Sequence, residues 1–324
     1  MAAPSKQVDI PVAGGGPTAS TGGVASWEMF HSNRQAWDAT LALCDSARSS
    51  VEIEQYIVRS KGIGHRLLDL LAAKARQGVD VRIVADGFGS FGLTATRGAR
   101  RLRAAGGRLA MFHGAGAILR SPAAAIHRLH RKSIICDGNR MMVGGSCFDP
   151  RMNDWRDTMV WVEGSLAAVA RLEFEDSWAR ATGDHASSGP ATSYDGGPWR
   201  YCVSTTTPPV RHEYFPELIR QIEGAVHRVI LTTPYLVPGG GQWKLLEKAL
   251  VDAVARGVSV YLIFPARSDH AWVDMISRRV ARDLARDGIR MCAYEPASCM
   301  RSWHPSTTGG QVSGASILAS TACG

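Results

Sequence analysis

A short segment of the sequence places a histidine and a lysine in a pattern that suits a phosphate group. His130 and Lys132 lie two residues apart, immediately before the apolar run 133–136. Side chains alternate along an extended strand, so both residues are expected to point to the same face. An imidazole can attack phosphorus or transfer a proton, and an ammonium group beside it neutralises charge on the phosphoryl oxygens. The spacing therefore predicts phosphoryl chemistry at this pair.

The elements that must position this pair are predicted from apolar periodicity. Residues 36–49 and 65–77 have helical spacing, and each is followed by a strand-like run, at 51–58 and 79–85. Helices alternating with strands in this order are typical of a parallel sheet covered by helices.

The same order of elements recurs later in the chain. Tyr56 is matched by Tyr235, 179 positions on, and the segment 78–81 is matched by 257–260 at the same offset. The helices and glycine turns around these positions follow in the same order. The sequence therefore predicts an internal duplication.

Composition limits the class of protein. The chain has 324 residues, of which 45% are hydrophobic and 20% charged, enough to form two cores. This excludes a disordered chain and a small disulfide-stapled protein. The formal net charge of +8 favours an acidic surface or a phosphate-bearing substrate. The seven cysteines show no paired spacing, which indicates reduced thiols in a cytosolic protein without structural zinc.

Shifts in composition predict where the domains begin and end. The stretch 183–199 is poor in apolar residues and rich in Gly, Ser and Pro, as a linker is. The predicted segments are a flexible N-terminal segment (1–26), a first domain (27–182), the linker (183–199), a second, truncated domain (200–299) and an unstructured or frameshifted tail (300–324).

The sequence predicts no membrane-spanning element. Residues 1–25 lack the basic region and apolar run of a secretory signal, and about 18 consecutive apolar residues occur nowhere. Contact with a membrane is therefore expected from its surface.

The segment around His130 resembles the signature of the phospholipase D superfamily, H-x-K-x4-D-x6-G-[SG]-x-N. His130, Lys132, Asp137, Gly144 and Gly145 match it. The position of the asparagine is occupied by Cys147, which we expect to pack as a small hydrophobic residue.

Three further segments resemble the cardiolipin synthase-like branch of that superfamily. They are the W-R-D-T stretch 155–158, the P-Y-L-V-P stretch 234–238 and the P-A-R-S-D stretch 265–269. The resemblance covers roughly residues 27–296.

The resemblance implies two tandem phospholipase D-like α/β/α units, each with a mixed, mostly parallel sheet flanked by helices. The units would be duplicates related by a pseudo-twofold axis, with the second incomplete. It also implies that His130, Lys132 and Asp137 are catalytic, the aspartate orienting a histidine, with one histidine forming a phosphohistidine. Gly144, Gly145, Tyr56 and Tyr235 are expected to bind substrate. No metal and no cofactor is expected.

A second motif is missing where the resemblance requires one. His304 is not followed by a lysine at the second position, and residues 306–324 carry no strand signal. A shifted reading frame from Cys299 onward would permit H-x-K-x4-D-x6-G-S-x-N, so we expect the tail 300–324 to be frameshifted. The chain then has one motif, and a homodimer is one way to supply a second.

The favoured function is that of a phosphatidyltransferase or phospholipase most like cardiolipin synthase, with activity in doubt because the second motif is missing. The expected partner is an anionic phospholipid such as phosphatidylglycerol, met peripherally at the inner, cytoplasmic face of a membrane. The loop 87–93 is a candidate lipid contact. The alternatives are a nuclease or phosphodiesterase of the same superfamily, with nucleic acid the less favoured partner, and an inactive phospholipid-binding protein.

Overall fold

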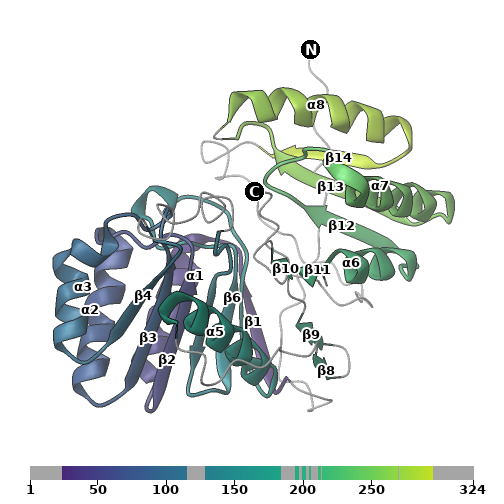
Figure 1. Ribbon diagram of the computed structural model, residues 1–324. Coiled ribbons are helices and arrows are strands. Elements are labelled where there is room, and N and C mark those ends of the chain that lie inside the picture. The colour runs from purple at the N-terminus through teal and green to yellow at the C-terminus, as the bar shows by residue number, and fades with distance from the viewer. Residues whose placement is uncertain are drawn as a thin grey trace. The chain divides into compact units, whose positions relative to one another are not determined.

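The computed structural model describes residues 24–114, 128–183, 194–196, 199–201, 204–205, 211–212, 214–268 and 270–294 (Figure 1). These residues form two compact units that divide between Arg211 and His212. The described residues exclude most of the predicted N-terminal segment and the whole tail 300–324, which contains His304. The shifted-frame hypothesis concerns this tail.

The first unit is built on a seven-stranded sheet with the strand order β1-β7-β6-β5-β2-β3-β4. The strands are β1 (Ser26–Phe30), β2 (Ser50–Gln55), β3 (Asp80–Asp86), β4 (Arg108–Phe112), β5 (Ser133–Cys136), β6 (Arg140–Gly144) and β7 (Met159–Glu163). The helices are α1 (Asn33–Ser46), α2 (Gly62–Arg76), α3 (Arg97–Ala104) and α5 (Leu166–Thr182), with short 3-10 turns η1 (Leu93–Ala95) and η3 (Pro150–Met152).

The sheet combines a parallel half with an antiparallel half. β2, β3 and β4 pair in parallel, whereas β5, β6, β7 and β1 each pair antiparallel with their neighbours. The expectation of a mixed α/β sheet flanked by helices is confirmed. The parallel half is the part that the alternation of helices and strands predicts.

Helices cover both faces of the sheet. Alternate residues of one strand pack to opposite sides: Ile83 joins a core with α1, α2 and α3, while Val84 joins a core with α5. Ile134 and Ile135 of β5 divide between the same two cores. This two-residue alternation between two apolar layers explains why these strands are continuously hydrophobic in sequence.

The second unit contains a three-stranded parallel sheet, β12-β13-β14. Its strands are β12 (Arg228–Thr232), β13 (Ser259–Pro265) and β14 (Arg290–Tyr294), and its helices are α6 (Tyr214–Glu223), α7 (Gly240–Ala255) and α8 (Ala271–Arg286). Four short strands precede it: β8 (Tyr194–Gly196), β9 (Trp199–Tyr201), β10 (Ser204–Thr205) and β11 (Arg211–His212).

The two units repeat the same strand and helix order, as the sequence offset predicts. β13 begins and ends 179 residues after β3, and α7 ends 179 residues after α2. The repeat covers the parallel half only. Within the described residues, β12 pairs with β13 alone, whereas its counterpart β2 pairs with both β3 and β5.

The predicted strand 51–58 ends earlier than expected, at Gln55. Beyond that point the chain leaves the sheet, and Val58 forms an isolated bridge with Phe148. The hydroxyl of Ser90 accepts a hydrogen bond from the Val58 amide at 3.0 Å and donates one to the Tyr56 carbonyl at 2.9 Å. These contacts hold the backbone of Tyr56 beside the loop after β3.

Candidate functional site

His130 and Lys132 lie side by side just before β5. The Nζ atom of Lys132 is 2.7 Å from Nδ1 and 3.1 Å from Nε2 of His130, and it donates a hydrogen bond to the His130 carbonyl at 2.8 Å. The Gly144 amide donates to the Lys132 carbonyl at 3.3 Å, which ties this segment to β6. The structure thus brings together the two side chains that strand alternation predicts on one face.

The residue between them, Arg131, points the other way and anchors the segment. Its guanidinium donates to Glu173 of α5 at 2.6 Å and to Glu54 of β2 at 2.9 Å, and both carboxylates are fully buried. Such charge-assisted bonds are among the stronger ones in proteins. They fix which face His130 and Lys132 present.

Tyr56 completes the immediate surroundings of His130. The two ring centroids are 4.6 Å apart, and Nζ of Lys132 lies 5.6 Å from the tyrosine ring. The structure therefore brings Tyr56 into the site. Tyr235 belongs to the second unit, where its ring lies 6.1 Å from that of His270.

Asp86, at the end of β3, was not predicted, and it binds the backbone on both sides of the site. Its fully buried carboxylate accepts hydrogen bonds from the amides of Phe88 and Gly89 through one oxygen and from the amide of Leu129 through the other, each at 2.9 Å. One side chain therefore joins the loop after β3 to the residue that precedes His130.

The two glycines of the motif allow a close approach between β6 and the segment that precedes β7. A β-carbon on Gly145 would lie 2.1 Å from Oδ1 of Asp157, and one on Gly144 would lie 2.1 Å from the carbonyl oxygen of Thr158. Asp157 was not predicted as a site residue, although the W-R-D-T stretch contains it. Its carboxylate interacts electrostatically with Lys132.

Burial sets the protonation of the pair. It lowers the pKa of His130 to about 3, with the charge of Lys132 contributing, and it lowers the pKa of Lys132 to about 8. Burial also raises the pKa of Asp157. At neutral pH His130 is therefore an uncharged imidazole beside an ammonium group, the state in which a histidine acts as a nucleophile.

The structure differs from the expectation for Asp137, which lies at the opposite end of β5 from His130. Asp137 and Gly138 have positive φ values of 54° and 72° and form the turn between β5 and β6. The Asp137 carboxylate accepts hydrogen bonds from the amides of Arg48, Ser49 and Ser50. Burial alone would raise its pKa, but these bonds hold the pKa well below its usual range. Its described contacts thus hold the turn and orient no histidine.

Cys147, at the asparagine position, is buried, with 3% of its surface exposed. Burial raises the pKa of its thiol, and its carbonyl accepts a hydrogen bond from the indole of Trp37 at 3.1 Å. Its surroundings are those of a packed apolar residue.

The described part of the chain has neither a bilayer-crossing helix nor a metal-binding cluster. None of its helices is long and apolar enough to cross a bilayer. In the same residues, no three His, Cys, Asp or Glu side chains are grouped so as to hold a metal ion.

The chain is similar in sequence to proteins of one known family. The family described as "Cardiolipin synthase, PLD-like domain" matches residues 41–178 and 218–307. Cardiolipin synthase A of Pseudomonas putida (strain W619) is 31% identical over 279 residues, covering 83% of this chain and 57% of that protein. Cardiolipin synthase A of Pseudomonas aeruginosa (strain LESB58) is 30% identical over 270 residues, covering 81% and 54%. The chain thus spans a little over half the length of these relatives.

A solved structure shares the fold. The crystal structure of phosphatidylserine synthase from Haemophilus influenzae Rd KW20 aligns with a TM-score of 0.56 and 12% identity, covering 80% of this chain and 68% of that one.

Proposed function

Since the chain belongs to the phospholipase D superfamily, among the cardiolipin synthase-like proteins, we propose that it transfers a phosphatidyl group through a covalent bond to His130. The observation that carries this proposal is the uncharged, half-buried imidazole of His130 with Nζ of Lys132 at 2.7 Å. The imidazole supplies the nucleophile, and the ammonium group supplies positive charge where the phosphoryl oxygens gather negative charge.

The first step exchanges one bond for another. A ring nitrogen of His130 bonds to phosphorus while the bond from phosphorus to the leaving alkoxide breaks. The alkoxide must take up a proton, and we propose Lys132 as its donor, because its Nζ lies 2.7 Å from His130 and burial lowers its pKa to about 8. A second step, in which an alcohol or water attacks phosphorus, releases His130.

The substrate we propose is an anionic glycerophospholipid such as phosphatidylglycerol. The names of the relatives and the net charge of +8 support this choice. We propose peripheral action at the inner, cytoplasmic face of a membrane. We also propose Tyr56, Gly144 and Gly145 as substrate-binding residues, because they border His130 and Lys132.

The second half of the reaction is where this chain departs from the superfamily pattern. The described part of the second unit ends at β14, and the sequence beyond it has no second H-x-K motif. We propose that a second acid and base come from a second copy of the chain.

The test uses the whole chain and its His130→Ala variant with phosphatidylglycerol vesicles. We expect the wild type to form an acid-labile phosphoenzyme or a transphosphatidylated lipid, detected by mass spectrometry, and the variant to form neither. Cleavage of DNA or of bis-p-nitrophenyl phosphate without any action on lipid would favour the nuclease reading. Binding of lipid without any product from the wild type would favour the inactive binding protein.

A further inference from the structure

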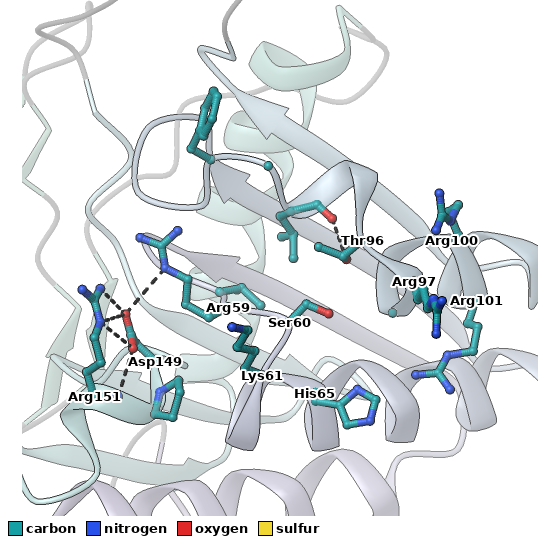
Figure 2. A pocket seen from close by; sticks show the side chains of 16 residues that line it. Arg59, Ser60, Lys61, His65, Thr96, Arg97, Arg100, Arg101, Asp149 and Arg151 are labelled. Atoms are coloured by element: carbon teal, nitrogen blue, oxygen red, sulfur yellow. Dashed lines mark hydrogen bonds and ion pairs between the residues drawn. The ribbon is translucent and has the colours of Figure 1, made fainter.

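A basic cavity lies on the first unit, outside the residues that form the His130 site. Its volume is about 1060 Å³, and three segments line it: the chain from the end of β2 into α2, the stretch from the loop after β3 into α3, and η3 with the residue before it (Figure 2). Neither His130 nor Lys132 lines it. Six Lys and Arg side chains do: Arg59, Lys61, Arg97, Arg100, Arg101 and Arg151.

Acidic side chains neutralise only part of this charge. Asp149 is the single carboxylate among the lining residues, and it is shared between Arg151 and Arg59, whose Nε lies 3.6 Å away. Arg101 pairs with Asp69 at 2.6 Å. Among the described residues, no carboxylate forms an ion pair with Lys61, Arg97 or Arg100, so the cavity retains an excess of positive charge.

Close packing at two glycines and one backbone hydrogen bond hold the walls in place. A β-carbon on Gly64 would lie 1.9 Å from the Arg59 carbonyl oxygen, and one on Gly98 would lie 3.1 Å from Oγ of Ser60. The Arg59 amide donates to the Phe148 carbonyl at 2.9 Å. The cavity is thus preformed, and Figure 2 shows Arg59 and Arg151 on one side of Ser60 and Lys61 and the α3 arginines on the other.

Two aromatic side chains stand exposed on the loop that borders this cavity. Phe88 is 67% exposed and Phe91 is 74% exposed, and Phe91 also lines the cavity. Removing such side chains from water is favourable. A free phosphate ion would leave both rings in water, whereas the interface of a bilayer would cover them.

We propose that this cavity binds the phosphate of an anionic phospholipid in a bilayer, as a second lipid site separate from the His130 site, with Phe88 and Phe91 entering the membrane interface. The loop that carries both rings also packs against Tyr56. The approach is so close that a β-carbon on Gly89 would lie 2.4 Å from the Tyr56 carbonyl oxygen. This contact connects the proposed membrane loop to Tyr56, whose ring lies 4.6 Å from that of His130. The proposal concerns binding and does not depend on turnover.

The test measures flotation of the full chain with vesicles of equal parts phosphatidylglycerol and phosphatidylcholine, and with pure phosphatidylcholine. The wild type is expected to float with the anionic vesicles only, and less at high salt. The Arg97→Gln/Arg100→Gln variant is expected to bind about 30-fold more weakly, since each basic side chain near an anionic surface contributes about 1 kcal/mol. The Phe88→Ala/Phe91→Ala variant is expected to lose about 10-fold or more.

The matched control removes the same charge from another helix. Arg279 and Arg282 are exposed, three positions apart on α8, and form no ion pair with described residues, as is true of Arg97 and Arg100 on α3. We expect the Arg279→Gln/Arg282→Gln variant to bind like the wild type. An equal loss in this control, or no loss in either cavity variant, would overturn the proposal. Circular dichroism and unfolding midpoints verify that each variant folds.

Two further arms separate the sources of binding. The His130→Ala variant should float like the wild type even if it yields no product, so the proposed function can fail while this proposal stands. Loss of flotation in that variant would assign the binding to the His130 site instead. Saturable binding of inorganic phosphate without any flotation would assign the cavity to a soluble phosphate and contradict the lipid source.

Discussion

The amide of Leu129, the residue before His130, donates a hydrogen bond of 2.9 Å to the buried carboxylate of Asp86. The other oxygen of Asp86 holds the loop that packs on Tyr56. The end of one parallel strand therefore determines where the proposed nucleophile and its aromatic neighbour lie. Asp86 is a positioning residue, since it acts through Leu129 and the loop.

Replacing this carboxylate should destabilise the first unit. An amide at position 86 cannot accept all three backbone hydrogen bonds, and an unsatisfied buried group costs about 1–3 kcal/mol. We expect Asp86→Asn to lower the free energy of unfolding by that amount in urea. Asp80 at the exposed start of β3 is the matched control, and Asp80→Asn should change stability by less than about 1 kcal/mol. Equal effects would contradict the role assigned to Asp86.

Removing the charge of Lys132 should raise the pKa of His130. Burial and the ammonium group together lower that pKa to about 3, so Lys132→Met should move it back toward the ordinary value of 6.5. The measurement is the pH dependence of the His130 ring signals in NMR. If the pKa were unchanged in the variant, the electrostatic coupling of the pair would be refuted.

The low pKa of His130 also predicts how stability depends on pH. Between about pH 3 and pH 6.5 the unfolded chain binds a proton that the folded chain does not, so stability should fall as the pH drops through this range. The contribution amounts to at most about 1.4 kcal/mol per pH unit. His130→Asn removes the titrating group, so its unfolding free energy should depend less steeply on pH than that of the wild type. Parallel pH profiles would count against a neutral, buried His130.

A methyl group at Gly145 should disturb the site more than the fold. The added β-carbon would lie 2.1 Å from Oδ1 of Asp157, so the carboxylate beside Lys132 must move. We expect Gly145→Ala to reduce the rate of phosphoenzyme formation by at least about 10-fold. Gly106→Ala is the control for stability alone. Gly106 lies in a turn with φ of 94°, and a β-carbon there would meet no neighbouring atom. A rate as fast as that of the wild type would show that the close approach of Gly145 to Asp157 is dispensable.

Much of the fold is predictable because it repeats. The strand β3 and its counterpart β13 share the same apolar pattern and the same preceding glycine turn. The prediction of a strand at one position therefore supports the prediction of a strand at the other. The antiparallel half of the first sheet is harder to predict from the sequence. Asp137-Gly138 is a turn-forming dipeptide, and it begins the three-residue connection 137–139 between Cys136 and Arg140, which pair across it. This signal predicts a turn at Asp137.

The site is predictable only as far as it is local in sequence. The facing of His130 and Lys132 follows from strand alternation. Asp86 and Asp157 lie more than ten residues from that pair in the sequence and reach it only through the fold. No rule based on sequence spacing predicts such contacts. The exposure of Phe88 and Phe91 beside a basic cavity likewise depends on how the loop after β3 folds back on Tyr56.

The most direct test of the account is the search for a covalent phosphohistidine. The full chain is incubated with phosphatidylglycerol labelled in the phosphate, quenched in alkali, in which phosphohistidine survives, and digested for mass spectrometry. The account predicts a phosphatidyl or phosphoryl adduct on the peptide that contains His130, absent from His130→Ala and weaker in Lys132→Met. An adduct on another residue, or product formed equally well by His130→Ala, would contradict it.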